Sequence, residues 1–205
     1  TVTATANSGV VSTLKTLSGT SADQISMVLD AVSSVSAADL QALNDLTGAA
    51  VDATAVANIT GTNAELVSLV EKVGLGQISL TKTGSSAVTF TVTAGTSVVD
   101  SKETSALTSI TTLTGFTEGV VNASAIDVIQ VATPSQASAF STLKADGDLI
   151  TAAESLDIVQ PNPTDKTIKA SEAISLGSSN ASTTVDLSLI ETITGTSRSE
   201  ERRVG

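Results

Sequence analysis

Three acidic residues in the second half of the chain have the types and spacing that could bind calcium. Asp146, Asp148 and Glu154 resemble the loop of an EF-hand, in which alternating oxygens and a distal bidentate Glu surround the ion. The match lacks two required features, because Lys144 occupies the first ligand position and the glycine of the sharp turn is missing unless one residue is deleted. A helix end followed by a helix cap explains the same residues. We therefore predict no tight calcium site and assign no metal ligand.

Catalytic chemistry has few residues to use in this sequence, which contains no His, Cys, Trp or Tyr. The usual general base, the commonest transition-metal ligand and any disulfide are thereby removed. A nucleophile elbow, a phosphate-binding loop and a dinucleotide fingerprint are also absent from the sequence. We predict no catalytic residue and no cofactor, and we expect that the chain is not an enzyme.

A row of threonines is a further candidate. Thr89, Thr91 and Thr93 alternate with apolar residues over 87–93, which predicts a half-buried strand with the threonines facing outward. Regular threonine rows order water in ice-binding proteins. Only one such strand is clear here, so ordinary strand propensity explains the row better.

The sequence also contains Asn-X-Ser/Thr patterns of the kind that accept N-linked carbohydrate, at Asn58, Asn122 and Asn180. In a chain this rich in Ser and Thr such patterns arise by chance. We assign no modification to them.

The charge balance disfavours one class of partner. Lys and Arg number 10 against 21 Asp and Glu, a net charge of −11, and nucleic-acid binding needs a basic surface. No run of 18 apolar residues is present, so we expect no membrane span. Hydrophobic residues make up 40% of the chain but aromatic residues only 1%, which favours thin layers of Val, Ile, Leu and Ala over one large core.

The clearest predicted helix covers 62–73. Thr62 and Glu65 form a capping box, apolar residues follow at helical spacing, and Gly74 is expected to end the helix with a positive φ. The same pattern predicts further helices over 20–32 and from Thr133 to 146, with shorter ones over 36–46, 103–113 and 151–154. We expect 20–32 and 62–73 to be the most regular elements.

Strands are predicted over 77–81 and 87–93, with a turn over 82–86 between them. The segments 51–59 and 120–129 fit either a helical turn or a strand, and a short strand is the favoured interpretation.

Apolar triplets and capped helices recur along the chain at uneven spacing, which indicates a repeat architecture with insertions. We predict an α/β fold, an elongated solenoid-like stack of short capped helices and short strands. Its expected parts are a partial repeat (1–35), repeat units (36–102 and 103–160), a linker with a truncated repeat (161–196) and a tail (197–205).

Several phrases resemble the low-complexity repeats of giant surface proteins of marine cyanobacteria and other bacteria. They are Leu40 to Gly48, Val51-Asp52-Ala53-Thr54, Ile59-Thr60-Gly61-Thr62, Gly74-Leu75-Gly76, Ile78-Ser79-Leu80 and Val121-Asn122-Ala123-Ser124. The resemblance is good over 36–81, weaker over 103–145 and slight over 146–184. It implies an extracellular structural or adhesive role without known chemistry.

The last nine residues differ in composition from the rest, because 197–205 contains all three arginines. This segment resembles translated sequencing-adaptor sequence, so we expect that the natural protein continues beyond Thr196 and that the tail is not a binding arm.

Together these features favour a structural segment of a large secreted or cell-surface protein, such as a stalk, coat or adhesin. The expected partners are neighbouring repeats of the same chain and possible contacts with the cell surface or extracellular matrix. A ligand-dependent or calcium-dependent adhesive module is the alternative, and a soluble enzyme comes third.

Overall fold

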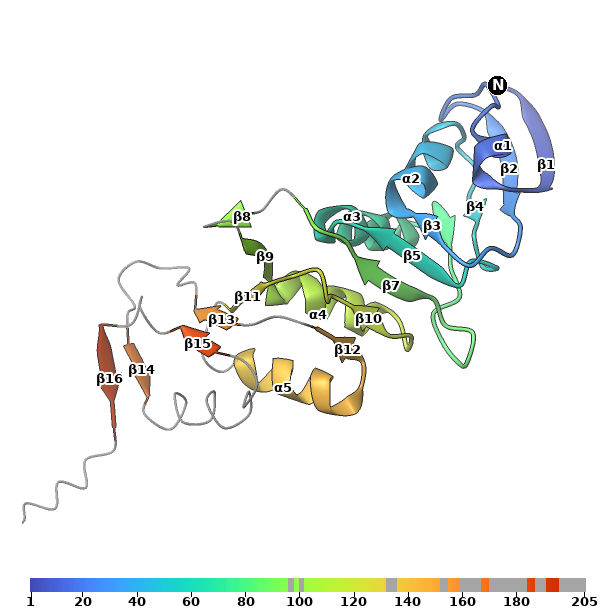
Figure 1. The fold of residues 1–205 in the computed structure, drawn as a ribbon. Helices are drawn as coiled ribbons and strands as arrows, with labels where there is room; N and C mark the ends of the chain where they lie inside the picture. The colour runs from blue at the N-terminus through green and yellow to red at the C-terminus, as the bar shows by residue number, and fades with distance from the viewer. Residues whose placement is uncertain are drawn as a thin grey trace, which may run out of the picture.

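The computed structural model describes residues 1–95, 98–99, 102–131, 136–151, 155–158, 167–169, 184–186 and 191–195. Within these ranges the chain is a mixed α/β structure of short helices and short strands, with β1 at one end and β16 at the other (Figure 1). The helices are α1 (Val11–Leu14), α2 (Ala37–Asp45), α3 (Asn63–Gly74), α4 (Leu107–Phe116) and α5 (Gln136–Asp146).

The first sheet has the order β1-β2-β4-β6, with bounds Thr3–Gly9, Gln24–Leu29, Val51–Asp52 and Ile78–Ser79. The second sheet has the order β3-β5-β7-β10-β12, with bounds Val35–Ser36, Asn58–Gly61, Thr89–Val92, Val121–Asn122 and Leu149–Ile150. Every pairing in these two sheets is parallel.

The third sheet joins β8 (Val98–Val99), β9 (Lys102–Ala106), β11 (Val128–Val131), β13 (Ser155–Ile158) and β15 (Thr184–Asp186). Its pairings are parallel except that of β8 with β9. A two-stranded parallel sheet joins β14 (Thr167–Lys169) to β16 (Thr192–Thr194).

The chain can be divided into successive segments, each of which contains one or more strands followed by a helix. We call these segments units: unit 1 is β1–α1, unit 2 is β2–β3–α2, unit 3 is β4–β5–α3, unit 4 is β6–β7–β8–β9–α4, and unit 5 is β10–β11–α5. Helices of consecutive units pack against one another, from α1 on α2 to α4 on α5. Each unit crosses a given sheet in the same direction as the unit before it. Strands of consecutive units therefore pair in parallel.

The pair of sheets to which a unit contributes strands changes at unit 4, and we call this the phase change. Strand β7 of this unit pairs with β5, the last strand of unit 3, and also with β10, the first strand of unit 5. The strand β6 closes the first sheet, while β9 pairs with β11 in the third sheet. Unit 4 thus contributes strands to all three sheets, and unit 5 adds its strands to the second and third sheets instead of the first and second.

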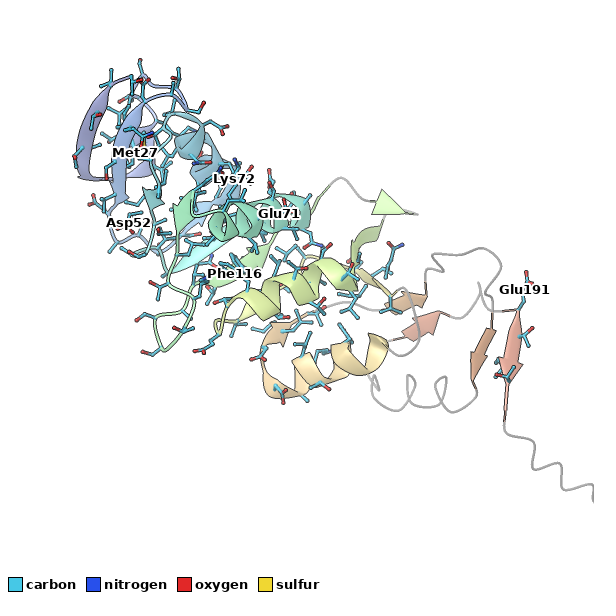
Figure 2. The ribbon with its side chains drawn as sticks, turned by 180° about the vertical axis from the view of Figure 1, so that it is seen from behind. Met27, Asp52, Glu71, Lys72, Phe116 and Glu191 are labelled. Carbon is cyan, nitrogen blue, oxygen red and sulfur yellow. The ribbon has the colours of Figure 1, made fainter. Side chains whose placement is uncertain are left out.

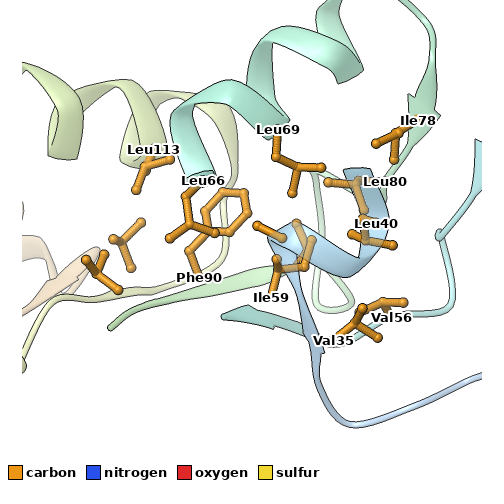
Figure 3. Packing of buried hydrophobic residues seen from close by; sticks show 14 of the residues in the cluster. Val35, Leu40, Val56, Ile59, Leu66, Leu69, Ile78, Leu80, Phe90 and Leu113 are labelled. Atoms are coloured by element: carbon orange, nitrogen blue, oxygen red, sulfur yellow. The ribbon is translucent and has the colours of Figure 1, made fainter. Parts of the chain in front are cut away.

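The core lies between the helices and the sheets (Figure 3). Leu40, Leu66, Leu69 and Leu113 project from α2, α3 and α4 and are fully buried. They cover apolar strand residues such as Phe90, whose ring centroid lies 5.9 Å from that of Phe116. With so few aromatic side chains, the core is mostly aliphatic, as the composition predicts.

The structure confirms several local predictions. The capping box at Thr62 and Glu65 begins α3, and Ser36 caps α2 by accepting from the backbone N–H of Asp39. The 87–93 strand is β7, and the 51–59 and 120–129 segments each contain two short strands separated by a turn.

The helix predicted over 20–32 is wrong, since Gln24–Leu29 forms β2. Ile25, Met27 and Leu29 are buried and alternate with more exposed residues, which is the period of a strand. Positions three and four apart in this stretch are also apolar, and that coincidence produced the helical prediction.

Two boundaries also differ from the predictions. The helix expected over 103–113 begins at Leu107, because Lys102–Ala106 forms β9. Gly74 belongs to α3, and the glycine with positive φ is Gly76, at +73°. A glycine with positive φ satisfies the helix end two residues later than predicted.

Some predictions fall outside the described residues: the cap at Thr133, most of 151–154, nearly all of 161–184 and the 197–205 tail. The helix expected after Thr133 is described from Gln136 to Asp146.

Candidate functional site

A buried threonine lies at the turn between α2 and β4. The Thr47 hydroxyl accepts from the backbone N–H of Ile25 at 2.9 Å and donates to the carbonyl of Asp23 at 3.2 Å. Gly48 follows it, and a Cβ atom there would lie 2.5 Å from the carbonyl oxygen of Ser21. The turn after α2 in unit 2 therefore lies so close to the residues before β2 that no side chain fits at position 48.

The turn after α4 repeats the arrangement with different neighbours. The hydroxyl of buried Thr117 donates to the carbonyl of Val88 at 2.7 Å and accepts from the N–H of Gly119 at 2.9 Å. A Cβ atom at Gly119 would collide with the Val88 carbonyl oxygen. In both turns the threonine hydroxyl thus forms hydrogen bonds with backbone groups that are shielded from water.

Hydroxyl and amide groups form a ladder along the second sheet. The Asn58 side-chain oxygen accepts from Thr89 at 2.9 Å and from Thr91 at 3.1 Å. Its amide nitrogen donates to the hydroxyl of Ser34 at 3.2 Å. The threonine row singled out in the sequence therefore bonds to the neighbouring strand, whereas Thr93 lies at its exposed end.

A polar hollow of about 490 Å³ lies beside the C-terminal ends of α2 and α3. Asn44, which is 7% exposed, donates to the carbonyl of Gln77 and accepts from the Lys72 ammonium at 3.2 Å. Lys72 projects from α3 (Figure 2). Its ammonium also lies 3.8 Å from the exposed Asp45 carboxylate. The lysine is thus shared between an amide and a carboxylate of the preceding unit.

A second hollow, of about 560 Å³, opens between α1 and β3. On its wall Lys15 donates to Asp39 at 2.7 Å. The Lys15 ammonium, together with the Ser36 hydroxyl, holds the pKa of the Asp39 carboxyl below its usual value against the opposing effect of burial. This ion pair is partly exposed and contributes little to stability.

The repeated phrases at 51–54 and 121–124 have a common local structure. In the first, Asp52 accepts from the backbone N–H and the hydroxyl of Thr54, at 3.0 and 2.6 Å. In the second, Asn122 accepts from the N–H of Ser124 at 3.0 Å. Each phrase is a strand that ends in a turn stabilised by an Asp or Asn side chain.

The residues considered for calcium lie at the end of α5. The helix ends at Asp146, Gly147 has a φ of +83°, and Asp148 is exposed. Glu154 lies outside the described residues. Among the residues that the structure describes, no group of three or more acidic, His or Cys residues could hold a metal ion.

Two of the glycosylation patterns fall on structured turns and strands. The Asn58 amide nitrogen, to which carbohydrate would be attached, is the atom that donates to Ser34. Asn122 uses its side-chain oxygen to hold the turn after β10. Asn180 lies outside the described residues.

The sequence did not identify the buried threonines, although a signal for them is present. Thr47 and Thr117 each lie four residues before the Val that begins the Val-Asp/Asn-Ala-Ser/Thr phrase. By contrast, nothing local connects Lys15 with Asp39, which are 24 residues apart.

Comparisons with known proteins found no matching family model, no matching curated protein and no matching solved structure. Within the described residues, no helix is long and apolar enough to cross a membrane.

Proposed function

We propose that this chain is a structural segment of a large secreted or cell-surface protein, acting as part of a stalk, coat or adhesin scaffold. We further propose that it folds as an elongated, solenoid-like stack of units. The observation that carries the proposal is a set of side-chain hydrogen bonds that join one unit to the next.

These contacts recur at one-unit separation along the described chain. Lys15 bonds to Asp39, Gln41 to the carbonyl of Glu65, and Thr81 to the carbonyl of Thr54, with sequence separations of 24, 24 and 27 residues. The bonds of Asn58 to Ser34 of unit 2 and to Thr89 and Thr91 of unit 4 follow the same rule. In a repeat stack each unit contacts mainly its neighbours, and this is the pattern expected there.

The parallel sheets support the same architecture. Met27, Val51 and Ile78 occupy adjacent positions across the first sheet, one residue from each of three consecutive units. The phase change at unit 4 accounts for the uneven spacing of the repeated phrases, because that unit holds four strands whereas units 2, 3 and 5 hold two. A stack can accommodate such an insertion while the strands of the units before and after it remain paired.

Composition is compatible with a surface location. A net charge of −11 keeps an extended protein soluble, and a chain without Cys needs no particular redox compartment. The resemblance of several phrases to the repeats of giant bacterial surface proteins supports the same proposal.

Replacing Thr47 by Val tests the stack on the whole chain. The substitution keeps the shape and leaves the Ile25 N–H buried without its acceptor, which costs about 1–3 kcal/mol. In a stack, hydrogen exchange should accelerate in units 2 and 3 while α5 and β11 keep their protection.

Thr112→Val is the matched control, because the exposed Thr112 hydroxyl bonds only to the carbonyl of Thr108 in its own helix. We expect its effect on the free energy of unfolding to stay within about 0.5 kcal/mol. Equal loss of protection in all units after Thr47→Val would show one cooperative globular domain and contradict the stack.

A further inference from the structure

The turn between α5 and β12 contains the one Asp-Gly pair of the sequence, Asp146-Gly147, and the chain has no Asn-Gly pair. Helix α5 ends at Asp146 and β12 begins at Leu149, so only Gly147 and Asp148 lie between the two elements (Figure 1). The proposed scaffold function assigns no role to this pair, whose own chemistry is distinctive.

An Asp followed by Gly can react with its own backbone. The amide nitrogen of Gly147 attacks the Cγ atom of the protonated Asp146 carboxyl group, and a C–N bond forms. The carboxyl hydroxyl and the amide hydrogen leave as water, which produces a five-membered succinimide. Water then adds at one of the two ring carbonyls and breaks the C–N bond there. Addition at the main-chain carbonyl gives isoaspartate, in which the chain runs through the former side chain, without a net change in composition.

The surroundings of the pair leave room for this ring. Asp146 and Gly147 are both exposed, and a Cβ atom at Gly147 would have no other atom within 4 Å. The φ angle of Gly147 is +83°, a conformation in which other residues are strained. The turn therefore requires glycine at this position, and glycine is also the residue that hinders the attacking nitrogen least.

The end of α5 gives the reacting nitrogen little protection. The N–H of Gly147 donates to the carbonyl of Lys144 at 3.3 Å, which is longer than an ordinary N–H···O bond. This bond spans three residues rather than four, as in the tightened last turn of many helices. Helix ends open at a low cost in free energy, and each opening releases the Gly147 nitrogen for attack.

Isomerisation at this position would disturb the second sheet. Leu149 is 3% exposed and pairs with Val121 of β10. The carbonyl of Asp148 accepts from the N–H of Val121 at 2.9 Å, and the carbonyl of Ile150 accepts from the N–H of Ala123 at 2.7 Å. Isoaspartate adds one carbon to the main chain directly before these contacts, so the pairing and the burial of the leucine can no longer both be kept.

We propose that Asp146-Gly147 is a site of spontaneous isomerisation, at which Asp146 becomes isoaspartate and the join between α5 and β12 loosens as the protein ages. The site goes beyond the proposed function, since a scaffold needs no such reaction. Its effect is local, because the altered residue lies at the edge of unit 5.

Ageing the whole chain in warm neutral buffer tests the proposal. Peptide mapping with electron-transfer fragmentation distinguishes isoaspartate from aspartate, and we expect it to accumulate at Asp146. Asp148 is the internal control, because it is also exposed but precedes Leu149, whose side chain hinders the ring. Hydrogen exchange at the amides of Val121 and Ala123 should accelerate in the aged protein, while α3 keeps its protection.

Two matched variants separate this reaction from other damage. Asp146→Glu keeps the charge but would need a six-membered ring, which forms far more slowly, so both the isomer and the change in hydrogen exchange should be lost. Asp148→Glu should leave both as they are in the unaltered chain. Thermal melts of fresh samples should be alike for all three proteins, because both substituted side chains are exposed.

A peptide of residues 142–150 gives the rate without the fold, and the whole chain should react more slowly than the peptide. An unreacted Asp146 after the peptide has converted would overturn the proposal, as would equal isomer at Asp148. Unchanged exchange at Val121 in the isomerised chain would overturn the loosening. The Thr47→Val test uses fresh protein, so failure here and failure of the stack are distinguishable.

Discussion

Residues 20–29 and 62–74 begin with similar turns and continue as different structures. At the first, the N–H and hydroxyl of Thr20 donate to the Asp23 carboxylate, each at 3.1 Å. At the second, the N–H of Thr62 donates to the Glu65 carboxylate at 2.8 Å. A strand follows the first turn and a helix follows the second.

The backbone carbonyl of Asp23 shows why the first segment is not helical. In a helix it would accept from the N–H four residues later. Here it accepts from the N–H of Gly48 at 2.6 Å and from the Thr47 hydroxyl. The Asp23 carboxylate also accepts from the N–H of Val2, before β1. Contacts from the turn after α2 and from the residues before β1 thus take the groups that a helix would use.

The comparison teaches that a capping pattern predicts a turn rather than the element after it. Following Thr62, apolar residues recur only at helical spacing, and the helix forms. Following Thr20, the apolar residues fit both periods, and the position between β1 and β4 selects the strand.

Met27→Ala gives the largest effect and separates the two interpretations of 20–32. Met27 is fully buried in the strand but lies off the apolar face of the predicted helix, which consisted of other residues. We expect a loss of about 2–5 kcal/mol in the free energy of unfolding, measured by urea denaturation, and a similar loss for Leu69→Ala in α3.

The control for this measurement is Ser26→Ala, since Ser26 is exposed on the opposite face of β2 and should change stability by less than about 0.5 kcal/mol. A neutral Met27→Ala would contradict the strand and restore the helix over 20–32.

Removing the threonine hydroxyl from each turn gives an intermediate effect. Thr62→Ala should cost about 1 kcal/mol, because the hydroxyl caps α3 by accepting from the N–H of Glu65. Thr20→Ala should cost less than about 0.5 kcal/mol, since the turn is exposed and no helix depends on it. Equal costs in urea denaturation would show that the two turns are equivalent after all.

Local signals were sufficient for α2, α3 and β7. Each has an unambiguous period, and both helices begin with a side-chain cap that the sequence displays. The strand β9 was missed because Leu107 and Ile110 fit the helical spacing, and the four residues before them were read as part of the same helix.

The phase change at β7 and the inter-unit contacts could not be predicted in the same way. Pairing of β7 with both β5 and β10 depends on how many strands unit 4 holds, which no local pattern specifies. Likewise the bonds from Thr89 and Thr91 to Asn58 join residues 31 and 33 positions apart, and they become visible only when the units are placed side by side.

The smallest effect concerns the pH dependence of the first turn. Hydrogen bonds from the Val2 N–H and then from Thr20 lower the pKa of the Asp23 carboxyl below its ordinary value of 3.8, outweighing the opposing effect of burial. A lowered pKa in the folded state means that the unfolded state binds the proton first as the pH falls. The contribution to stability is therefore complete well above pH 3.8 and is lost as the pH falls through the lower, folded value. Asp23→Asn should make the urea midpoint less sensitive to acid as the pH falls below about 5. Carboxyl NMR measures the pKa of Asp23 directly, and a midpoint at or above 3.8 would show that the turn at 20–23 does not hold its carboxylate as the structure describes.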